Sequence, residues 1–361
     1  MKRTRVGLLF GGKSGEHQVS VSSARSLLSA LDPGKYDVVP IGITRQGQWL
    51  MAATPEQLLQ DEVILELPGT SEALPDVTHR GIVRVDPSGG IDVHQTTVDV
   101  VFPLLHGPQG EDGTVQGLFE LADIPYVGSG VLGSAVSMDK AMMKTVFAAE
   151  GLPGVPFQLV NAVELSVRRD EVVSRIENVL TYPIFVKPCN LGSSVGISKV
   201  RDNEELVVAL DLAGRHDRRL IVEQGIAGRE IECGVLGNED PVVSVPGEVV
   251  TDHEFYDFEA KYSEGEAELL IPADLSPEQT EQVQDLAVRA FRAVDAAGLA
   301  RVDFFIQESN GAVLLNELNT IPGFTQTSMY PKLWEATGVP YVELADRLIE
   351  LAFQRHRERR R

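Results

Sequence analysis

The chain has 361 residues, of which 53 are Asp or Glu and 32 are Lys or Arg, giving a formal net charge of -21 and a pI near 4.7. So acidic a protein is not expected to bind nucleic acid or an anionic membrane through its overall charge. Two cysteines are too few for a disulfide framework, and no apolar run is long enough for a signal peptide or a membrane span. We therefore expect a cytoplasmic protein.

The first part of the chain, residues 1–127, is predicted to be an open α/β domain that binds substrate. The predicted elements are strands at residues 6–10, 36–43 and 98–105, a helix after the Gly-rich loop at 11–15, and a helix at 114–122. Alternating strands and helices are typical of a largely parallel sheet with helices on both faces. Residues 50–97 contain Pro/Gly clusters, and we expect a partly irregular insertion there.

Two further domains are predicted, a central one at residues 128–222 and a C-terminal one at 223–361. Their predicted elements are a helix around 138–150, two strands within 182–200 that flank a Gly/Ser loop, strands at 220–223 and 231–236, a helix around 277–297 and a hairpin at 300–318. Five arginines between Arg355 and Arg361 follow an apolar helical stretch, and we expect them to be a solvated helix end.

The segment from Gly7 to Ser14 matches the P-loop expression letter for letter, but we reject this interpretation. A phosphate loop follows a buried strand, whereas residues 8–10 are themselves the strand material here. A dinucleotide-binding turn is also excluded, because the G-x-G-x-x-G pattern is missing and Glu16 would face a pyrophosphate. Glu16 instead either caps a helix or faces the crevice where open α/β sheets bind ligands, and the loop that begins at His106 could share that crevice.

Four polar side chains of the C-terminal hairpin are the strongest candidates for a metal site. Strand alternation puts Arg301 and Asp303 on one face, and Glu317 and Asn319 likewise. A three-residue turn at 309–311 then places Asp303 opposite Glu317 and Arg301 opposite Asn319. Opposed carboxylates need a cation between them, and such oxygen ligands suit Mg²⁺. The alternative is a solvated face on which Arg301 neutralises Asp303, but four polar residues in a row on one face favour a site.

A Gly/Ser-rich loop at residues 190–196 follows Lys187 at the end of an apolar strand. Small residues let backbone N–H groups approach phosphate oxygens, and Lys187 supplies a positive charge. An ordinary Gly-rich hairpin loop is the alternative. The phosphate interpretation gains weight only together with the metal hairpin.

Taken together, these segments resemble the D-alanine:D-alanine ligases of the ATP-grasp superfamily. The motifs that carry the resemblance are Gly11-Gly12 with Ser14-Gly15-Glu16-His17, His106-Gly107 with Gly110-Glu111-Asp112-Gly113, Met138-Asp139-Lys140, Lys187-Pro188, residues 192–196, Lys261-Tyr262, Arg301-Val302-Asp303, residues 316–320, and Pro322-Gly323. The match spans residues 11–329 and implies an α/β (α+β) ATP-grasp fold of three domains, with ATP held between the central and C-terminal ones.

The resemblance also implies a nucleotide and metal site. Lys140 and Lys187 would hold the ATP phosphates, with Ser193, Ser194 and Lys261 also in the nucleotide site. Glu223 and the backbone near Ile226 would bind adenine, and Glu230 the ribose. Asp303, Glu317 and Asn319 would hold two Mg²⁺ ions, with Mn²⁺ as an alternative ion, and these would offset charge on the transferring phosphoryl group.

The implied reaction transfers the γ-phosphoryl group to the first D-alanine, whose acyl phosphate is then attacked by the amine of the second. Glu16 would bind the first ammonium group with His106 nearby, while Arg301 and the Gly323 N–H stabilise the oxyanion. The second carboxylate would lie at Ser328 and the Met329 backbone. The product would be the dipeptide of peptidoglycan precursors.

A lid around residues 251–265 is implied as well, with Lys261 and Tyr262 on it. The Tyr262 hydroxyl would reach Ser193, which in turn reaches Glu16, so that lid closure and substrate recognition are coupled. Members that make the D-lactate ester often carry histidine in the position of Tyr262, because its positive charge repels an ammonium group. The neutral Tyr262 therefore favours the dipeptide.

Two alternatives were weighed against a D-alanine:D-alanine ligase. One is a superfamily ligase that uses D-lactate or another D-amino acid, and the other is a nucleotide sensor that shares the fold but does no chemistry. A sensor needs no oxyanion donor, so an enzyme is favoured by four residues together: Arg301, Glu317, Asn319 and Lys261. The family is commonly dimeric, and we expect a homodimer.

Overall fold

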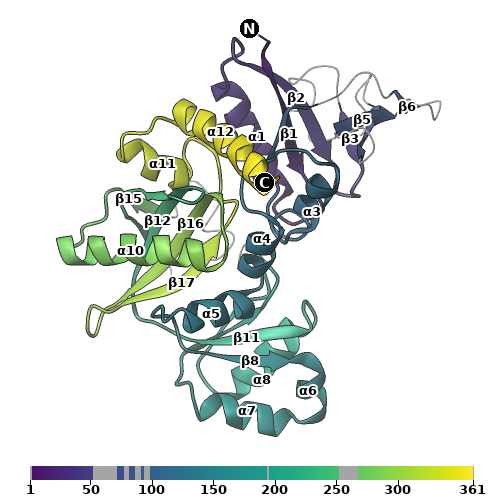
Figure 1. Cartoon of the computed structure of the whole chain (residues 1–361). Coiled ribbons are helices and arrows are strands. Elements are labelled where there is room, and N and C mark those ends of the chain that lie inside the picture. The colour runs from purple at the N-terminus through teal and green to yellow at the C-terminus, as the bar shows by residue number, and fades with distance from the viewer. Residues whose placement is uncertain are drawn as a thin grey trace.

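The computed structural model describes residues 2–51, 71–76, 81–85, 91–92, 98–192, 195–251 and 267–360. They form three β-sheets with packed helices, here termed the N-terminal, central and C-terminal sheets (Figure 1). No helix in these ranges is long and apolar enough to cross a membrane.

The N-terminal sheet has the strand order β6-β5-β4-β3-β2-β1-β7. Its strands are β1 (Thr4–Gly11), β2 (Tyr36–Ile43), β3 (Trp49–Met51), β4 (Ser71–Asp76), β5 (Gly81–Val85), β6 (Ile91–Asp92) and β7 (Val100–Pro103). Strands β2, β1 and β7 are parallel, which confirms the predicted parallel centre. All pairs from β3 outward are antiparallel, so the expectation of a largely parallel sheet was wrong there. Successive antiparallel strands need only short turns and no crossover helix.

Helices cover both faces of this sheet, as predicted. Val6, Leu8 and Phe10 of β1 face α1 (His17–Ala30) and α12 (Tyr341–Arg359), while Leu9 faces α3 (Thr114–Leu121) on the other side. This alternation follows from the period of two in a strand. Because β1 continues to Gly11, residues 7–11 are strand and cannot be a phosphate loop, which confirms that the P-loop match is false.

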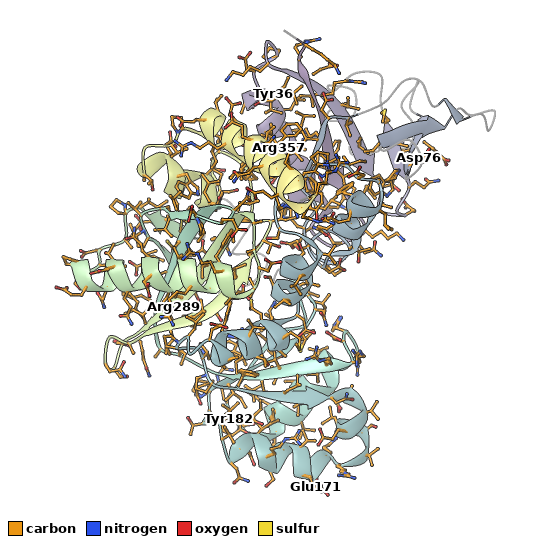
Figure 2. The ribbon with its side chains drawn as sticks, in the orientation of Figure 1. Tyr36, Asp76, Glu171, Tyr182, Arg289 and Arg357 are labelled. Carbon is orange, nitrogen blue, oxygen red and sulfur yellow. The ribbon has the colours of Figure 1, made fainter. Side chains whose placement is uncertain are left out.

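The last helix, α12, docks on the N-terminal sheet although it ends the chain (Figure 1). Tyr36, labelled in Figure 2, donates its hydroxyl to Asp346 of α12 at 2.7 Å. The Arg355 guanidinium lies 4.2 Å from the centre of the Tyr126 ring. The ion pairs made by this basic end are Arg355 and Arg359 with Glu120, and Arg360 with Asp123. Arg359 and Arg360 are nonetheless exposed at the helix end, as expected, whereas Arg355 is mostly buried and departs from the expectation of a solvated run.

The central sheet is antiparallel, with the order β10-β9-β11-β8. Its elements are β8 (Phe157–Asn161), α6 (Ala162–Val167), α7 (Arg169–Glu177), β9 (Ile184–Pro188), β10 (Ser198–Val200), α8 (Asn203–Ala213) and β11 (Arg219–Gln224). One face of the sheet packs on these three helices. The predicted strands at 182–200 and 220–223 are confirmed.

The helix predicted around residues 138–150 is confirmed as α5 (Lys140–Ala149), and α4 (Val131–Met138), which was not predicted, precedes it. The break is at Asp139, whose backbone is extended and whose carboxylate caps α5 by accepting the Met142 N–H at 3.0 Å. The same carboxylate pairs with Arg219 of the central sheet. Asp139, which was predicted to lie in the first turn of this helix, is thus its N-cap.

The C-terminal sheet has the order β15-β14-β12-β16-β17, with β13 paired to β12. Its elements are β12 (Gly228–Gly237), β13 (Val242–Val243), β14 (Gly247–Thr251), β15 (Ala267–Leu270), α10 (Pro277–Ala293), β16 (Gly298–Gln307), β17 (Val313–Asn319) and α11 (Met329–Ala336). The predicted hairpin is β16 and β17. Helix α10, which begins with a capping box at Ser276, covers the apolar face together with α5.

Candidate active site

A polar cleft of about 1360 Å³, its open mouth included, is bordered by all three sheets. Ten residues singled out in the sequence line it: Glu16, His106, Lys140, Lys187, Glu230, Arg301, Asp303, Glu317, Asn319 and Gly323. They come from loops of the N-terminal sheet, from α5, from the central sheet, and from β12, the hairpin and the loop after it in the C-terminal part. Segments up to about 300 residues apart in the sequence thus meet in one place.

Eight other predicted site residues do not line this cleft or lie outside the described ranges. Glu223, Ile226, Ser328 and Met329 are described but are absent from the lining. The Met329 side chain is buried against Val249 and Leu333, so it belongs to the core. The predictions for four residues fall outside the described part of the chain: Ser193, Ser194, Lys261 and Tyr262.

The C-terminal hairpin has the predicted register at its cleft end. Asp303 lies opposite Glu317, and Arg301 lies opposite Asn319. The turn is one residue longer than predicted, because the N–H of Gln307 donates to the carbonyl of Ala312. A β-bulge between Asp303 and Phe304 compensates for the longer turn, so that the pairs beyond it have the predicted register. The predicted pairing is therefore correct, although the predicted turn is wrong.

Arg301 is held by two buried carboxylates. Its guanidinium donates two hydrogen bonds to Asp303, at 2.8 and 2.7 Å, and lies 3.1 Å from Glu232. Burial lowers the pKa of Arg301, but Asp303 and Glu232 outweigh burial and raise the pKa above its ordinary value. Arg301 therefore keeps its charge and a fixed orientation in the cleft.

These contacts bear on the proposed metal site. Asp303, Glu317 and the Asn319 amide provide oxygen donors on one strand pair. Nowhere in the described ranges do three or more acidic, His or Cys side chains form a ready-made metal cluster. Mg²⁺ usually takes only one or two protein carboxylates and shares the rest of its shell with substrate phosphates and water. The donor set fits an ion that arrives with a nucleotide.

A buried charge cluster lies beneath the cleft. Glu223 is 3% exposed and pairs with Lys187 at 2.6 Å and with Lys144 at 3.0 Å. Burial alone would raise the pKa of Glu223, but Lys144 and Lys187 outweigh it and lower the pKa to about 2. Lys140, one turn before Lys144, lies 3.7 Å from Glu317 and donates to the carbonyl of Leu191. The cleft therefore offers cationic groups to a polyanion despite the acidic composition.

Glu16 is buried among backbone loops at the far end of the cleft. A Cβ atom at Gly107 or Gly192 would lie only 2.9 or 3.1 Å from Oε2 of Glu16, so glycine leaves room for the carboxylate. His106 donates from Nδ1 to the carbonyl of Ile321 at 3.0 Å, and burial lowers its pKa. The imidazole is then neutral, with Nε2 as a buried acceptor that has no partner among the described residues.

Glu111 lines the same end of the cleft, and its carboxylate accepts the N–H of Gly107. Burial and the neighbouring Glu16 raise the pKa of Glu111 from 4.5 to about 8. Ionisation of such a group costs stability, with no cost below pH 4.5 and a growing cost up to about pH 8. We expect Glu111→Gln to remove this loss of stability. The unfolding free energy of the variant, relative to that of the unmodified chain, should therefore increase between pH 4.5 and about pH 8. Denaturant titrations at several pH values give both profiles, and parallel profiles would contradict the assignment.

Three charged residues in or beneath the cleft were not proposed individually from the sequence: Glu111 and Glu232, which line it, and Lys144, which lies in the charge cluster beneath it. Glu232 shares a strand face with Glu230 in the pattern Glu-Ile-Glu, so alternation could have indicated it. Lys144 lies four residues after Lys140 on α5, and this spacing places both on one helix face. Neither pattern indicates which distant carboxylate a side chain meets.

Comparisons with known proteins agree with this geometry. The family model described as D-ala D-ala ligase N-terminus matches residues 5–129, and the one described as D-ala D-ala ligase C-terminus matches residues 146–350. A D-alanine–D-alanine ligase of Geobacillus kaustophilus is 51% identical over 99% of this chain and 96% of its own length.

Two solved structures extend the likeness. The D-alanine-D-alanine ligase from Coxiella burnetii has a TM-score of 0.86 at 38% identity, over 100% of this chain and 97% of its own. The VanG D-Ala:D-Ser ligase from Enterococcus faecalis has a TM-score of 0.86 at 34% identity, over 97% of this chain and 100% of its own. The ATP-grasp fold expected from the sequence is therefore confirmed, and the chain belongs to the D-alanine–D-alanine ligase family.

Proposed function

We propose that the cleft joins two D-alanine molecules through an acyl phosphate formed from ATP, giving the dipeptide for peptidoglycan precursors. The observation that carries the proposal is the arrangement of the cleft. Carboxylates, lysines and a doubly held arginine from three sheets border one space. The same full-length relatives that define the family are D-alanine–D-alanine ligases by name. The chain is accordingly an ATP-dependent ligase, and the D-lactate alternative is not favoured.

ATP lies in this proposal between α5, the central sheet and the C-terminal hairpin. Lys140 and Lys187 bind its phosphates, supported by their position on the cleft wall. Glu230 on the wall binds the ribose. Glu223 and the backbone near Ile226 bind adenine, although the Glu223 carboxylate also holds Lys187 and Lys144. A carboxylate that fixes two lysines also sets where they present charge.

Asp303, Glu317 and Asn319 would hold two Mg²⁺ ions, with Mn²⁺ as an alternative. Bound there, the ions would neutralise phosphate charge during phosphoryl transfer. In this structure Asp303 accepts two hydrogen bonds from Arg301. This is the contact expected in the alternative interpretation of the sequence, in which Arg301 neutralises Asp303. Arg301 is hydrogen-bonded to Asp303 and also lines the cleft. The same side chain can therefore hold the metal ligand and stabilise the oxyanion.

The first D-alanine lies at the end of the cleft where Glu16 and His106 meet. Glu16 accepts from the substrate ammonium, and Nε2 of His106 offers a second acceptor. Arg301 and the N–H of Gly323 stabilise the oxyanion formed when the second amine attacks. All four residues line the same space.

The second carboxylate lies near the N-terminus of α11. Ser328 precedes this helix, and its hydroxyl is hydrogen-bonded to Thr325. A Cβ at Gly323 would lie 3.1 Å from that hydroxyl, so the oxyanion donor and the carboxylate pocket are adjacent. Free N–H groups at a helix N-terminus, including that of Met329, favour a carboxylate.

The roles of Ser193, Ser194, Lys261 and Tyr262 stay predictions, because these residues lie outside the described part of the chain. A homodimer, a cytoplasmic location and the domain limits 1–127, 128–222 and 223–361 stay predictions as well. The three sheets support a three-part organisation, but α12 of the last part packs on the first sheet.

A competition assay tests the choice of substrate. The purified chain is given ATP, Mg²⁺ and D-alanine near pH 7, with excess D-lactate or D-serine in separate reactions. D-serine is included because one structural relative is a D-Ala:D-Ser ligase. We expect mass spectrometry to find almost only D-alanyl-D-alanine, with ADP formation dependent on D-alanine. Abundant ester or D-alanyl-D-serine would overturn the assignment.

A further inference from the structure

Helix α5 is enclosed between the central and C-terminal sheets (Figure 1). Ala141 packs on Cys189 and Ile221 of the central unit, while Met143 and Phe147 belong to the C-terminal core. A polar side chain on this helix can therefore reach both sheets. Lys144 does so, with only 5% of its surface exposed.

The Lys144 ammonium group bridges the two sheets. Its Nζ lies 3.0 Å from Glu223 on β11 and donates to the carbonyl of Asn316 on β17 at 2.8 Å. A buried ammonium is costly unless charged and polar partners surround it. Lys144 could neutralise Glu223 without contacting Asn316. Its hydrogen bond to the Asn316 carbonyl therefore needs a separate explanation.

Asn316 is the extra residue of the β-bulge. Phe304 pairs with Leu315 on one side of it, and Asp303 pairs with Glu317 on the other. With the Leu315 register continued, Asn316 would lie opposite Asp303, and Glu317 would lie opposite the buried Val302. A one-residue slip moves every later side chain to the other face of a sheet. The bulge is thus what turns Glu317 and Asn319 toward the cleft.

The bulged segment lies on β17, the last of the described strands in its sheet, so its outer backbone groups pair with no other described strand. Residues from α5 and the loop after it take that place. The carbonyl of Pro153 accepts the Leu315 N–H at 2.7 Å, and Met143 Sδ accepts the Leu318 N–H at 3.3 Å. Between them Lys144 holds the Asn316 carbonyl, which is the contact on the bulge itself.

We propose that Lys144 is a positioning residue for the metal end of the cleft: by tying the Asn316 carbonyl to Glu223, it fixes the bulge that presents Glu317 and Asn319. The inference rests on the proposed Mg²⁺ role of those two residues. Lys144 itself contacts neither ATP nor the reacting atoms. Its loss should therefore affect Mg²⁺ more than the first D-alanine.

The test compares Lys144→Met, Glu223→Gln and the double variant. Methionine keeps the length of lysine but removes the donor and the charge. We expect Lys144→Met to weaken binding of Mg²⁺ with a non-hydrolysable ATP analogue by about tenfold or more, as for other groups that orient metal ligands. The KM for D-alanine at the first site should change less than twofold. Calorimetry gives the binding constants, and steady-state kinetics gives KM.

The double-mutant cycle separates fixing the bulge from merely neutralising Glu223. A role in the bulge predicts that Lys144→Met costs the same factor with Gln at position 223, because Asn316 still loses its donor. Disappearance of that cost would overturn the proposal. The double variant leaves no unpaired buried carboxylate, so it stays informative even where Lys144→Met fails to fold.

Hydrogen exchange gives a readout that is independent of activity. Amides of β17 should exchange faster in Lys144→Met, whereas those of β1 in the N-terminal sheet should not. Lys35→Met, which breaks an exposed pair with Asp346 at 2.7 Å, is the matched control and should alter neither β17 nor Mg²⁺ binding. Glu317→Gln is assayed in parallel. If only Glu317→Gln impairs Mg²⁺ binding, the role of Lys144 fails while the proposed function stands; if neither does, the metal assignment fails.

Discussion

Glu317→Gln is expected to lower kcat about a thousandfold or more while the chain stays folded, because several kcal/mol of charge stabilisation in phosphoryl transfer depend on a metal ligand. The substitution keeps the shape of the side chain and removes only its charge. Glu317 is partly exposed, and its described ion pair with Lys140 is long, at 3.7 Å. The unfolding free energy should therefore change by no more than about 1 kcal/mol.

The matched control is Glu308→Gln, at the exposed tip of the same hairpin and away from the cleft. It should leave kcat unchanged. Steady-state ADP release at saturating ATP and D-alanine, over a range of Mg²⁺ concentrations, gives the comparison. If the Glu317 variant keeps more than about a tenth of kcat, less than about 1.4 kcal/mol of the barrier depends on this charge, and Glu317 is not a metal ligand.

The hairpin shows how far strand alternation could carry the sequence analysis. The pairing of Asp303 with Glu317 was predicted correctly from a turn of the wrong length, because a bulge restores the register. Spacing did hold a signal: the buried residues Leu315 and Leu318 are three apart, where a regular strand would space them by two. What stabilises the bulge is a lysine from a helix some 170 residues earlier, and no local pattern reveals such a partner.

The fold was predictable wherever a single element buries one apolar face. Strand β2 was predicted with its observed bounds, and helices were correctly expected on both faces of the first sheet. The antiparallel strands β3 to β6 were missed, because short irregular segments leave no clear periodicity. The predicted start of α5, around residue 138, lies ahead of its N-cap, because a capping carboxylate such as Asp139 reads as an ordinary helical residue until its backbone is known.

The candidate site was predictable where residue type alone limits the chemistry, as for Asp303 and Glu317. Which charged side chains form ion pairs with one another was not predictable. Glu223 was assigned to adenine through family resemblance, yet both of its oxygens lie beside lysines in the structure. Arg301 was considered as a partner of Asp303, but its second carboxylate, Glu232, comes from a strand that only the sheet order makes a neighbour.

Arg301→Lys is expected to lower kcat about a hundredfold to a thousandfold while largely preserving the fold, since removing one oxyanion donor has this effect in other enzymes. Lysine keeps a positive charge between Asp303 and Glu232 but cannot make the two parallel hydrogen bonds of a guanidinium. Arg301→Met removes the charge as well. It leaves two buried carboxylates without their cation, and the unfolding free energy should fall by about 3–5 kcal/mol.

Arg229→Lys is the matched control for this pair of variants. Arg229 also makes two hydrogen bonds to one carboxylate, at 2.7 and 2.6 Å to Glu248, and it lies in the same sheet but outside the cleft lining. Its kcat should stay within about twofold of the unmodified chain, because the pair is partly exposed and does not contact substrate. Denaturant titration and single-turnover dipeptide formation separate stability from chemistry. A folded Arg301→Lys variant with the kcat of the Arg229 control would show that the guanidinium holds the sheet together and does not stabilise the oxyanion.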